Sequence, residues 1–234
     1  PVVHYTMGGI DTDIDAKTNL KGLFAAGECA CVSINGANRL GSNSLTELLV
    51  FGTRAGRGAA ELAMAETSLA DEAAIREQAA TARDRVGRLF QSVGGGESIT
   101  GLRREMNATM EAGAGIYRTE DSLRRSCLVI NDIAGRYADI ELEDKSNVYN
   151  TDLIQALELS AMIDVAGAII VSALQRKESR GSHQRLDHTE RDDEAYLKHS
   201  LAHYITGDDP RIDYRNVVIT RSAPGERVYG GPAK

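Results

Sequence analysis

Two residues near the start of the chain carry side chains that can hold a carboxylate together. Arg39 lies among Gly36, Asn38 and Gly41, which are small or turn-forming residues that leave room to present a guanidinium to a ligand. An arginine fork donates two parallel hydrogen bonds to a carboxylate. His4 can donate a further hydrogen bond to the same anion. The pair predicts a carboxylate-binding site, and the alternative is two structural side chains with no ligand.

Two neighbouring segments can supply further contacts to a bound molecule. Ser44 and Glu47 have the spacing of an S-x-x-E capping box, which predicts a helix that begins at or just before Ser44. The free N–H groups and positive dipole end at Ser44 and Leu45 can hold partial negative charge, although an ordinary cap has the same pattern. Glu28 follows an apolar run closed by Gly27, a place where an acidic residue often accepts hydrogen bonds from ribose hydroxyls.

The spacing of apolar residues predicts the elements that must position these side chains. Residues 23–26 are typical of a buried strand, and the helix from residue 44 carries small residues at 52, 56 and 60 that favour close packing. Helical patterns at 71–92, about 100–113, about 119–137 and about 150–177 predict a helical bundle, with a linker or turn at 94–96. Residues 217–220 and 228–231 favour short strands or an extended arm.

These patterns predict an α+β fold with three regions. Residues 1–68 form the remnant of an α/β domain, 69–205 a helical bundle domain, and 206–234 a short extended or β tail. The charge-dense segment 178–193 is either a solvated loop or a network that joins two domains.

Composition excludes several classes of function. Lys and Arg number 27 against 34 Asp and Glu, a formal charge of −7, so the chain lacks the basic field that binds nucleic acid. Its three cysteines are too few for a disulfide framework and lack the spacing of a zinc site, so we expect no metal. The apolar stretch 157–174 contains Glu158 and Asp164, which predicts a core helix and no transmembrane segment.

Six segments, in order, resemble the C-terminal part of the flavoprotein subunit of fumarate reductase and succinate dehydrogenase. They are HYTMGGI (4–10), GLFAAGE (22–28), GANRLGSNSL (36–45, continuing to 51–52), GIYRT (115–119), RKESRGSH (176–183) and RVYGG (227–231). Two alternatives remain: a related flavoenzyme, L-aspartate oxidase, and a non-catalytic helical module at 95–234 that docks an iron-sulfur subunit. Met7, Gly41 and the RVYGG segment favour the first family over L-aspartate oxidase.

The resemblance implies roles for the residues singled out above. The residues matching His4 and Arg39 bind a carboxylate of a C4 dicarboxylate, fumarate or succinate. The residue matching Glu28 holds the ribose of FAD, and those matching Ser44 and Leu45 contact the isoalloxazine ring through their backbone. The implied reaction is hydride exchange between flavin and dicarboxylate, with a slight preference for the bacterial fumarate reductase type. The resemblance also implies that electrons pass to an iron-sulfur subunit and a membrane quinone. It implies that the protein is held at the cytoplasmic face of the inner membrane by its partner subunits.

The sequence departs from the family in what it lacks. The G-x-G-x-x-G flavin motif, the histidine that bonds to FAD and the arginine proton donor are all expected upstream of Pro1. We therefore expect a fragment that has no catalytic residue of its own. We expect that it does not retain FAD and has no enzymatic activity. An open sheet edge in such a fragment also favours exchange of strands between copies.

Overall fold

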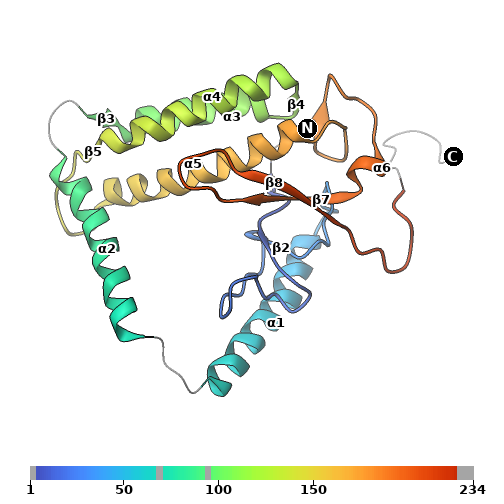
Figure 1. Cartoon of the computed structure of the whole chain (residues 1–234), viewed down its shortest axis with the longest axis horizontal. Coiled ribbons are helices and arrows are strands. Elements are labelled where there is room, and N and C mark those ends of the chain that lie inside the picture. The colour runs from blue at the N-terminus through green and yellow to red at the C-terminus, as the bar shows by residue number, and fades with distance from the viewer. Residues whose placement is uncertain (1–3, 67–70, 93–95, 226–234) are drawn as a thin grey trace.

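A computed structural model describes residues 4–66, 71–92 and 96–225 of the chain (Figure 1). Three long helices lie side by side: α3 (Ile99–Ala114), α4 (Glu120–Arg136) and α5 (Thr151–Gln175). Below them lie the N-terminal segment and α1 (Asn43–Ala65), while α2 (Glu72–Gln91) extends from the other end of the bundle. The fold is mostly helical with small strand pairs, so the predicted α+β class is confirmed.

The bundle forms where the sequence predicts, because its helices carry both local caps and apolar faces. Ser98 caps α3 through the N–H of Gly101, and Asn150 caps α5 through the N–H of Leu153 at 2.7 Å. The shared core is built from side chains of all three helices, including Leu102, Met106, Leu123, Ile130, Ile133, Leu159, Ile163 and Ile170. Each fully buried side chain of this size contributes about 1.5–3 kcal/mol to folding.

Short strand pairs join the ends of the helices. Strand β3 (Glu97–Ser98) pairs in parallel with β5 (Ile140–Glu141), which follows the 3₁₀ turn η1 (Tyr137–Asp139). Strand β4 (Tyr117–Arg118) pairs in parallel with β6 (Gln184–Arg185), which ties the segment after α5 to the start of α4.

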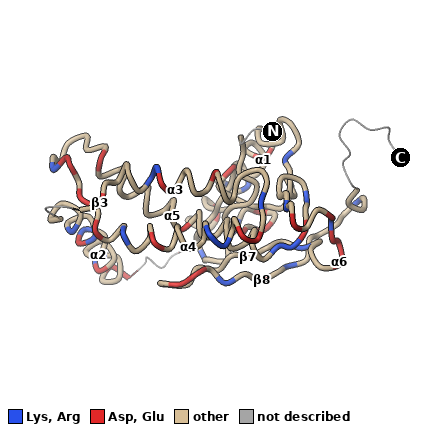
Figure 2. The backbone as a smooth tube through the Cα atoms, turned by 90° about the horizontal axis from the view of Figure 1, so that it is seen from above, with Lys and Arg blue, Asp and Glu red and all other residues tan. Residues whose placement is uncertain are grey.

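Helix α5 is the most apolar element in the described part of the chain. At 25 residues it is longer than the predicted apolar stretch, and it alone among the described helices is long and apolar enough by length and composition to cross a membrane. In this structure it packs against α3 and α4 as a core helix, as predicted. Charged residues of both signs are spread along the other elements (Figure 2).

Helix α1 begins one residue before Ser44 but without the predicted cap. Its N-cap residue is Ser42, whose φ of 65° is left-handed and whose side chain makes no cap hydrogen bond. Glu47, the expected partner of the capping box, is buried and accepts hydrogen bonds from Tyr5 and Asn35. The predicted capping box is therefore wrong, because Glu47 is recruited by tertiary donors.

Two further predictions for the N-terminal segment are wrong. Residues 23–26 form no strand, and Phe24 makes an isolated antiparallel bridge with Lys17, since no described strand runs beside them to complete a sheet. Nothing lies within 4 Å of the position that a Cβ would occupy at Gly52 or Gly56, so close packing is absent there. The strands that do pair are β1 (Ile10–Asp11) and β2 (Ala30–Cys31), in parallel.

The C-terminal strands lie earlier in the chain than predicted. Strands β7 (Lys198–His203) and β8 (Arg211–Asn216) form an antiparallel hairpin that follows the short helix α6 (Asp193–Tyr196) and packs on α5 (Figure 1). Residues 217–220 are not a strand, while 228–231 and the first two glycines of the 94–96 turn lie outside the described residues. The predicted boundary at 205/206 falls between these paired strands. The division into three regions remains a prediction.

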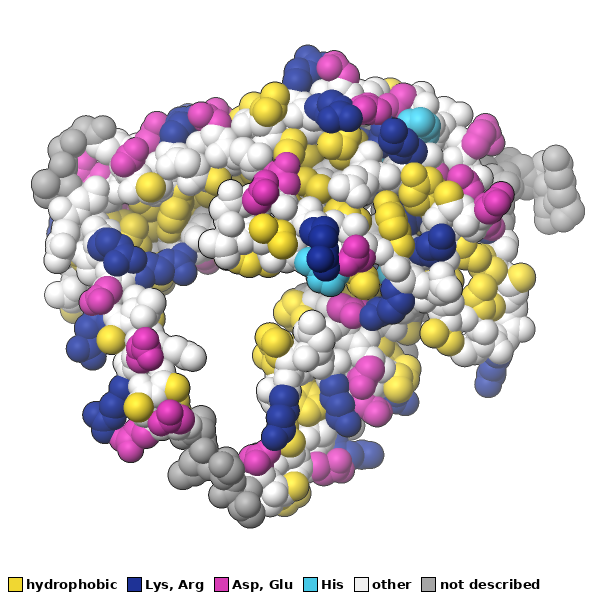
Figure 3. Space-filling view, viewed as in Figure 1, with side chains coloured by type: hydrophobic (Ala, Val, Ile, Leu, Met, Phe, Trp, Pro, Cys, Tyr) yellow, Lys and Arg dark blue, Asp and Glu magenta, His cyan; other side chains and the backbone are white. Residues whose placement is uncertain are grey.

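Helix α1 leaves much of its apolar surface exposed. Its buried residues are Glu47 and Phe51, whereas Leu45, Leu48 and Leu49 are more than half exposed. Figure 3 shows an open space between α1 and α2, with hydrophobic side chains along its edges. Ser44 and Leu45 thus lie on a helix that its own chain covers only in part.

Candidate functional site

The structure brings together the three N-terminal segments that the sequence singles out. The backbone N–H of Thr6 donates to Oε1 of Glu28 at 2.9 Å, and the N–H of Ile10 donates to the carbonyl of Cys29 at 2.8 Å. The guanidinium of Arg39 lies over the ring of Tyr5, 4.5 Å from its centre. Glu28 and Arg39 therefore both contact residues within two positions of His4, which is exposed.

Gly9 is required for this meeting of segments. Its φ of 133° lies in the region that L side chains avoid, and a Cβ at Gly9 would overlap the carbonyl of Cys29. The backbone at 8–10 can therefore approach β2 closely, which seats the segment that carries His4 beside Glu28.

Glu47 organises the inner side of the site. It is 2% exposed, and its Oε2 accepts hydrogen bonds from the Tyr5 hydroxyl at 3.1 Å and from Asn35 Nδ2 at 2.8 Å. Burial and the Glu47 carboxylate raise the pKa of Tyr5, so its hydroxyl stays protonated and donates. Since Tyr5 also stacks on Arg39, Glu47 fixes the surface on which Arg39 rests.

Arg39 is folded back onto its own loop. Its Nη1 donates to the carbonyl of Leu40 at 3.0 Å, and its buried Nε has no hydrogen-bond partner among the described residues. An unpaired buried donor costs about 1–3 kcal/mol. If the side chain rotated toward an anion, the Nε group could donate to it, which would remove this cost. The guanidinium could then donate two hydrogen bonds to one carboxylate.

The start of α1 is suited to a ligand with partial negative charge. Because Ser42 provides no side-chain cap, the positive end of the helix dipole is not neutralised by its own N-cap side chain. Leu45 is 64% exposed, but its N–H donates to the carbonyl of Ser42 at 3.1 Å, so the prediction that this N–H is free is wrong. Ser44, half-buried beside it, belongs to the same first turn.

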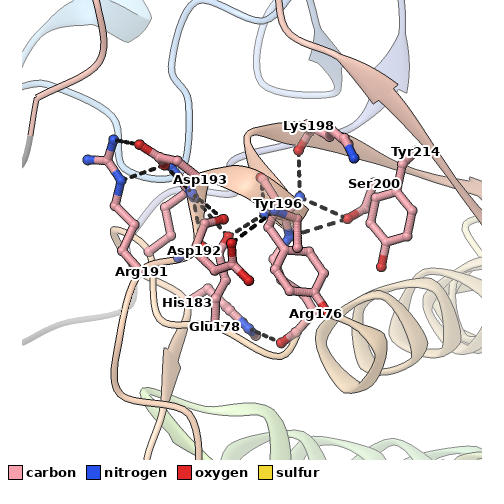
Figure 4. A network of polar contacts seen from close by, with 12 residues as sticks. Arg176, Glu178, His183, Arg191, Asp192, Asp193, Tyr196, Lys198, Ser200 and Tyr214 are labelled. Carbon is pink, nitrogen blue, oxygen red and sulfur yellow. Dashed lines mark hydrogen bonds and ion pairs between the residues drawn. The ribbon is translucent and has the colours of Figure 1, made fainter.

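Residues 178–193 were predicted as either a solvated loop or a network that joins two domains. In the structure they belong to loop 176–193, whose side chains form a network of polar contacts (Figure 4). Glu178 is fully buried and accepts from Arg176 Nη1 at 2.6 Å and from Arg180 Nε at 2.8 Å. Ser182 Oγ donates to the carbonyl of Ala37, which joins this loop to the segment of Arg39. The sequence pattern gave no signal for that particular contact.

His183 lies inside the same loop as a neutral side chain. A guanidinium can only donate, so Arg118 Nη1 donates to His183 Nδ1 at 3.1 Å, and Nε2 then donates to the carbonyl of Arg176 at 3.0 Å. Burial, together with the nearby arginine charges, lowers the pKa of His183 to about 4. The histidine of the RKESRGSH segment is thus a structural group at neutral pH.

One cluster of possible metal ligands among the described residues lies between the start of α4 and the loop that follows β6. Glu120, Asp187 and His188 each place one ligand atom within 4.8 Å of the others. However, Arg185 binds Asp187 with two hydrogen bonds at 2.7 and 2.8 Å and holds the pKa of that carboxyl well below its usual range. Arg124 likewise pairs with Glu120. Both carboxylates already have a cation, so we assign this cluster no metal.

Two family profiles and several known proteins match the sequence of this chain. The family profile described as "Fumarate reductase flavoprotein C-term" matches residues 103–229, and that described as "FAD binding domain" matches residues 1–45. The fumarate reductase flavoprotein subunit of Mycobacterium tuberculosis (strain H37Rv) is 52% identical over 98% of this chain and 40% of its own length. That of Escherichia coli K12 is 47% identical over 100% and 39%.

Solved structures agree with these sequence matches. FrdA of the E. coli quinol fumarate reductase superposes with a TM-score of 0.92 at 47% identity, covering 98% of this chain and 39% of that one. Mycobacterium smegmatis Sdh1, in complex with UQ1, superposes with a TM-score of 0.83 at 33% identity, covering 92% and 36%.

The fold and the match of residues 1–45 to the FAD binding domain family place the chain in the class of proteins with that domain. It belongs to the family of fumarate reductase and succinate dehydrogenase flavoprotein subunits. The chain spans about 40% of the length of the curated relatives that it matches.

Proposed function

We propose that the chain provides the dicarboxylate-binding residues, and part of the FAD-binding surface, of a fumarate reductase or succinate dehydrogenase flavoprotein. The observation that carries this proposal is the convergence of Arg39 and Glu28 on the segment that follows His4. Arg39 donates its fork to a carboxylate of fumarate or succinate, and His4 donates to the same group. The relatives named above support this family over L-aspartate oxidase.

The residues present fit part of a flavin site. The carboxylate of Glu28 is exposed and can accept a ribose hydroxyl, and the uncapped start of α1 at Ser44 and Leu45 can face the electron-rich edge of the ring. When bound, FAD supplies hydride exchange with the dicarboxylate. The role of these residues is to bind and orient, and the proton donor is expected outside this chain.

We further propose partners for the complete subunit. Electrons are exchanged with an iron-sulfur subunit and, through it, a membrane quinone, and the flavoprotein is peripheral on the cytoplasmic face of the inner membrane through these partners. The names of the relatives include a quinol fumarate reductase, which supports this assignment. The higher identity to fumarate reductase subunits, 47–52%, than to the succinate dehydrogenase subunits of Rickettsia, 38–40%, supports the fumarate reductase type.

Titration calorimetry with fumarate tests the dicarboxylate site. Arg39→Ala should weaken binding by about 1.5–3 kcal/mol, a loss of roughly tenfold to hundredfold, because a charge-assisted pair is removed. Arg54→Ala is a matched control, since Arg54 also stacks on an aromatic ring, that of Phe51, and donates to a backbone carbonyl, that of Ile14. Equal fumarate affinity in the two variants would contradict the assignment of Arg39.

A visible absorption spectrum tests the cofactor proposal. We expect the purified chain, after addition of FAD and removal of the excess, to show no flavin band. A retained band that bleaches with a low-potential reductant and recovers on adding fumarate would overturn the proposal that the chain alone is inactive.

A second candidate function is a docking module for the iron-sulfur subunit. It is favoured by the bundle's own hydrophobic core, which is built from residues of 99–173 with no buried residue from the N-terminal segment. Such a module should bind the iron-sulfur partner with no flavin present. If a titration without flavin detects no binding to the iron-sulfur subunit, the docking function is excluded.

A further inference from the structure

We propose that Gly181 and Ser182 form a clamp that positions the loop bearing Arg39, which makes them positioning residues for dicarboxylate binding. This inference rests on the proposed function of Arg39. Both the backbone N–H and the Oγ of Ser182 donate to the carbonyl of Ala37, each at 2.8 Å. These two bonds join positions 145 residues apart in the sequence.

Gly181 makes this approach possible. Its φ of 58° is left-handed, and a Cβ built there would lie 2.5 Å from the carbonyl oxygen of Ala37 and 2.9 Å from its Cβ. Real Cβ atoms do not come this close to a backbone oxygen, so a side chain at Gly181 must push Ala37 away. Backbone conformation and space thus both require glycine at this position.

Further hydrogen bonds hold the turn that contains Gly181 and Ser182 in place. Arg180 and His183 exchange backbone hydrogen bonds, at 2.8 and 3.0 Å, across the turn that contains the clamp. The fully buried Glu178 binds Arg180 through both of its oxygens. Arg185, 1% exposed, donates to the carbonyls at the end of α5, including that of Ala173 at 3.1 Å. The turn is therefore fixed to the core helix of the bundle.

The clamped carbonyl lies two residues before Arg39, in a loop rich in small residues. A displacement of Ala37 moves the backbone of Arg39 and therefore changes the position of its guanidinium. Recognition of a carboxylate by a fork demands placement within about 0.5 Å. The bundle thus sets the position of a ligand-binding side chain in the N-terminal segment.

Hydrogen exchange of the 234-residue chain tests the clamp directly. In Gly181→Ala we expect exchange of the Ser182 amide, whose N–H donates to the carbonyl of Ala37, to rise about tenfold relative to its intrinsic rate. Gly207→Ala is the matched control, because Gly207 has a similar left-handed φ of 74° but nothing within 4 Å of its Cβ position. Both variants carry similar backbone strain, and only Gly181→Ala disturbs Ala37. Unchanged exchange of the Ser182 amide in Gly181→Ala would overturn the clamp.

Fumarate calorimetry on the same variants tests the positioning role. We expect Gly181→Ala to weaken fumarate binding about tenfold, Ser182→Ala to weaken it less because its N–H bond remains, and Gly207→Ala to leave it unchanged. If Arg39→Ala weakens binding and Gly181→Ala does not, the positioning role is wrong. If exchange rises in Gly181→Ala while Arg39→Ala binds fumarate normally, the clamp holds and the proposed function of Arg39 fails.

Discussion

Replacing Glu178 by glutamine removes one negative charge from the centre of loop 176–193 while keeping the size of the side chain. The carboxylate accepts four hydrogen bonds: Oε1 from Arg176 and Arg180, and Oε2 from Arg180 and the N–H of Asp192. In Glu178→Gln, one of these oxygens becomes an amide NH₂ that faces two donors. The guanidiniums of Arg176 and Arg180, with side chains 13% and 16% exposed, lose the anion that they share.

We expect Glu178→Gln to lower the free energy of unfolding by about 3–5 kcal/mol, the cost of removing one partner from a buried ion pair. For a protein of this size each kcal/mol corresponds to about 2–4 °C in Tm, so Tm should fall by roughly 6–20 °C. Glu72→Gln is the matched control, since Glu72 pairs with Arg76 on α2 with both side chains more than three-quarters exposed. That change should cost less than about 0.5 kcal/mol.

Urea unfolding followed by circular dichroism measures both variants on one scale. A cost for Glu178→Gln no greater than that for Glu72→Gln would refute the reasoning. In that case the loop would be organised by its backbone bonds alone, and the buried charge would add nothing to its rigidity. The same comparison at high salt separates the two sites further, because salt screens the exposed pair far more than the buried one.

The helices were predictable because their signals are local. Each of α3, α4 and α5 repeats apolar residues at helical spacing and carries its own cap. In α4, Thr119 and Ser122 form a reciprocal capping box, so even the start of the helix depends on nearby residues.

The hairpin of β7 and β8 was missed because its alternation is weak. In β8, Ile212 and Tyr214 alternate with Asp213 and Arg215, but most of the strand remains exposed, so burial imposes no clear pattern. Pairing along the full length of β7 supplies the stability that neither strand shows by itself.

For the site, residue types were predictable and tertiary partners were not. The sequence singled out His4, Glu28 and Arg39, and the structure brings their segments together. It gave no sign that Glu47 would leave its expected cap to bind Tyr5. Contacts of this kind depend on how distant segments meet, and no local spacing encodes them.

Two further perturbations test the packing that supports the site. Because the pKa of His183 is about 4 in the fold and about 6.5 when unfolded, its stabilising contribution is complete above pH 6.5 and is lost as pH falls toward 4. His183→Gln should flatten that part of the stability curve, measured as Tm against pH, and an unchanged slope would contradict the buried neutral state. Gly113→Ala should cost about 1–3 kcal/mol, since its Cβ would overlap Ser126 between α3 and α4. Gly167→Ala, with open space at its Cβ in α5, should instead stabilise by up to about 1 kcal/mol. If Tm falls in Gly113→Ala and rises in Gly167→Ala, the contact between α3 and α4, and not helix propensity, determines whether the substitution stabilises the protein. Equal shifts in Tm would contradict the close approach of these helices.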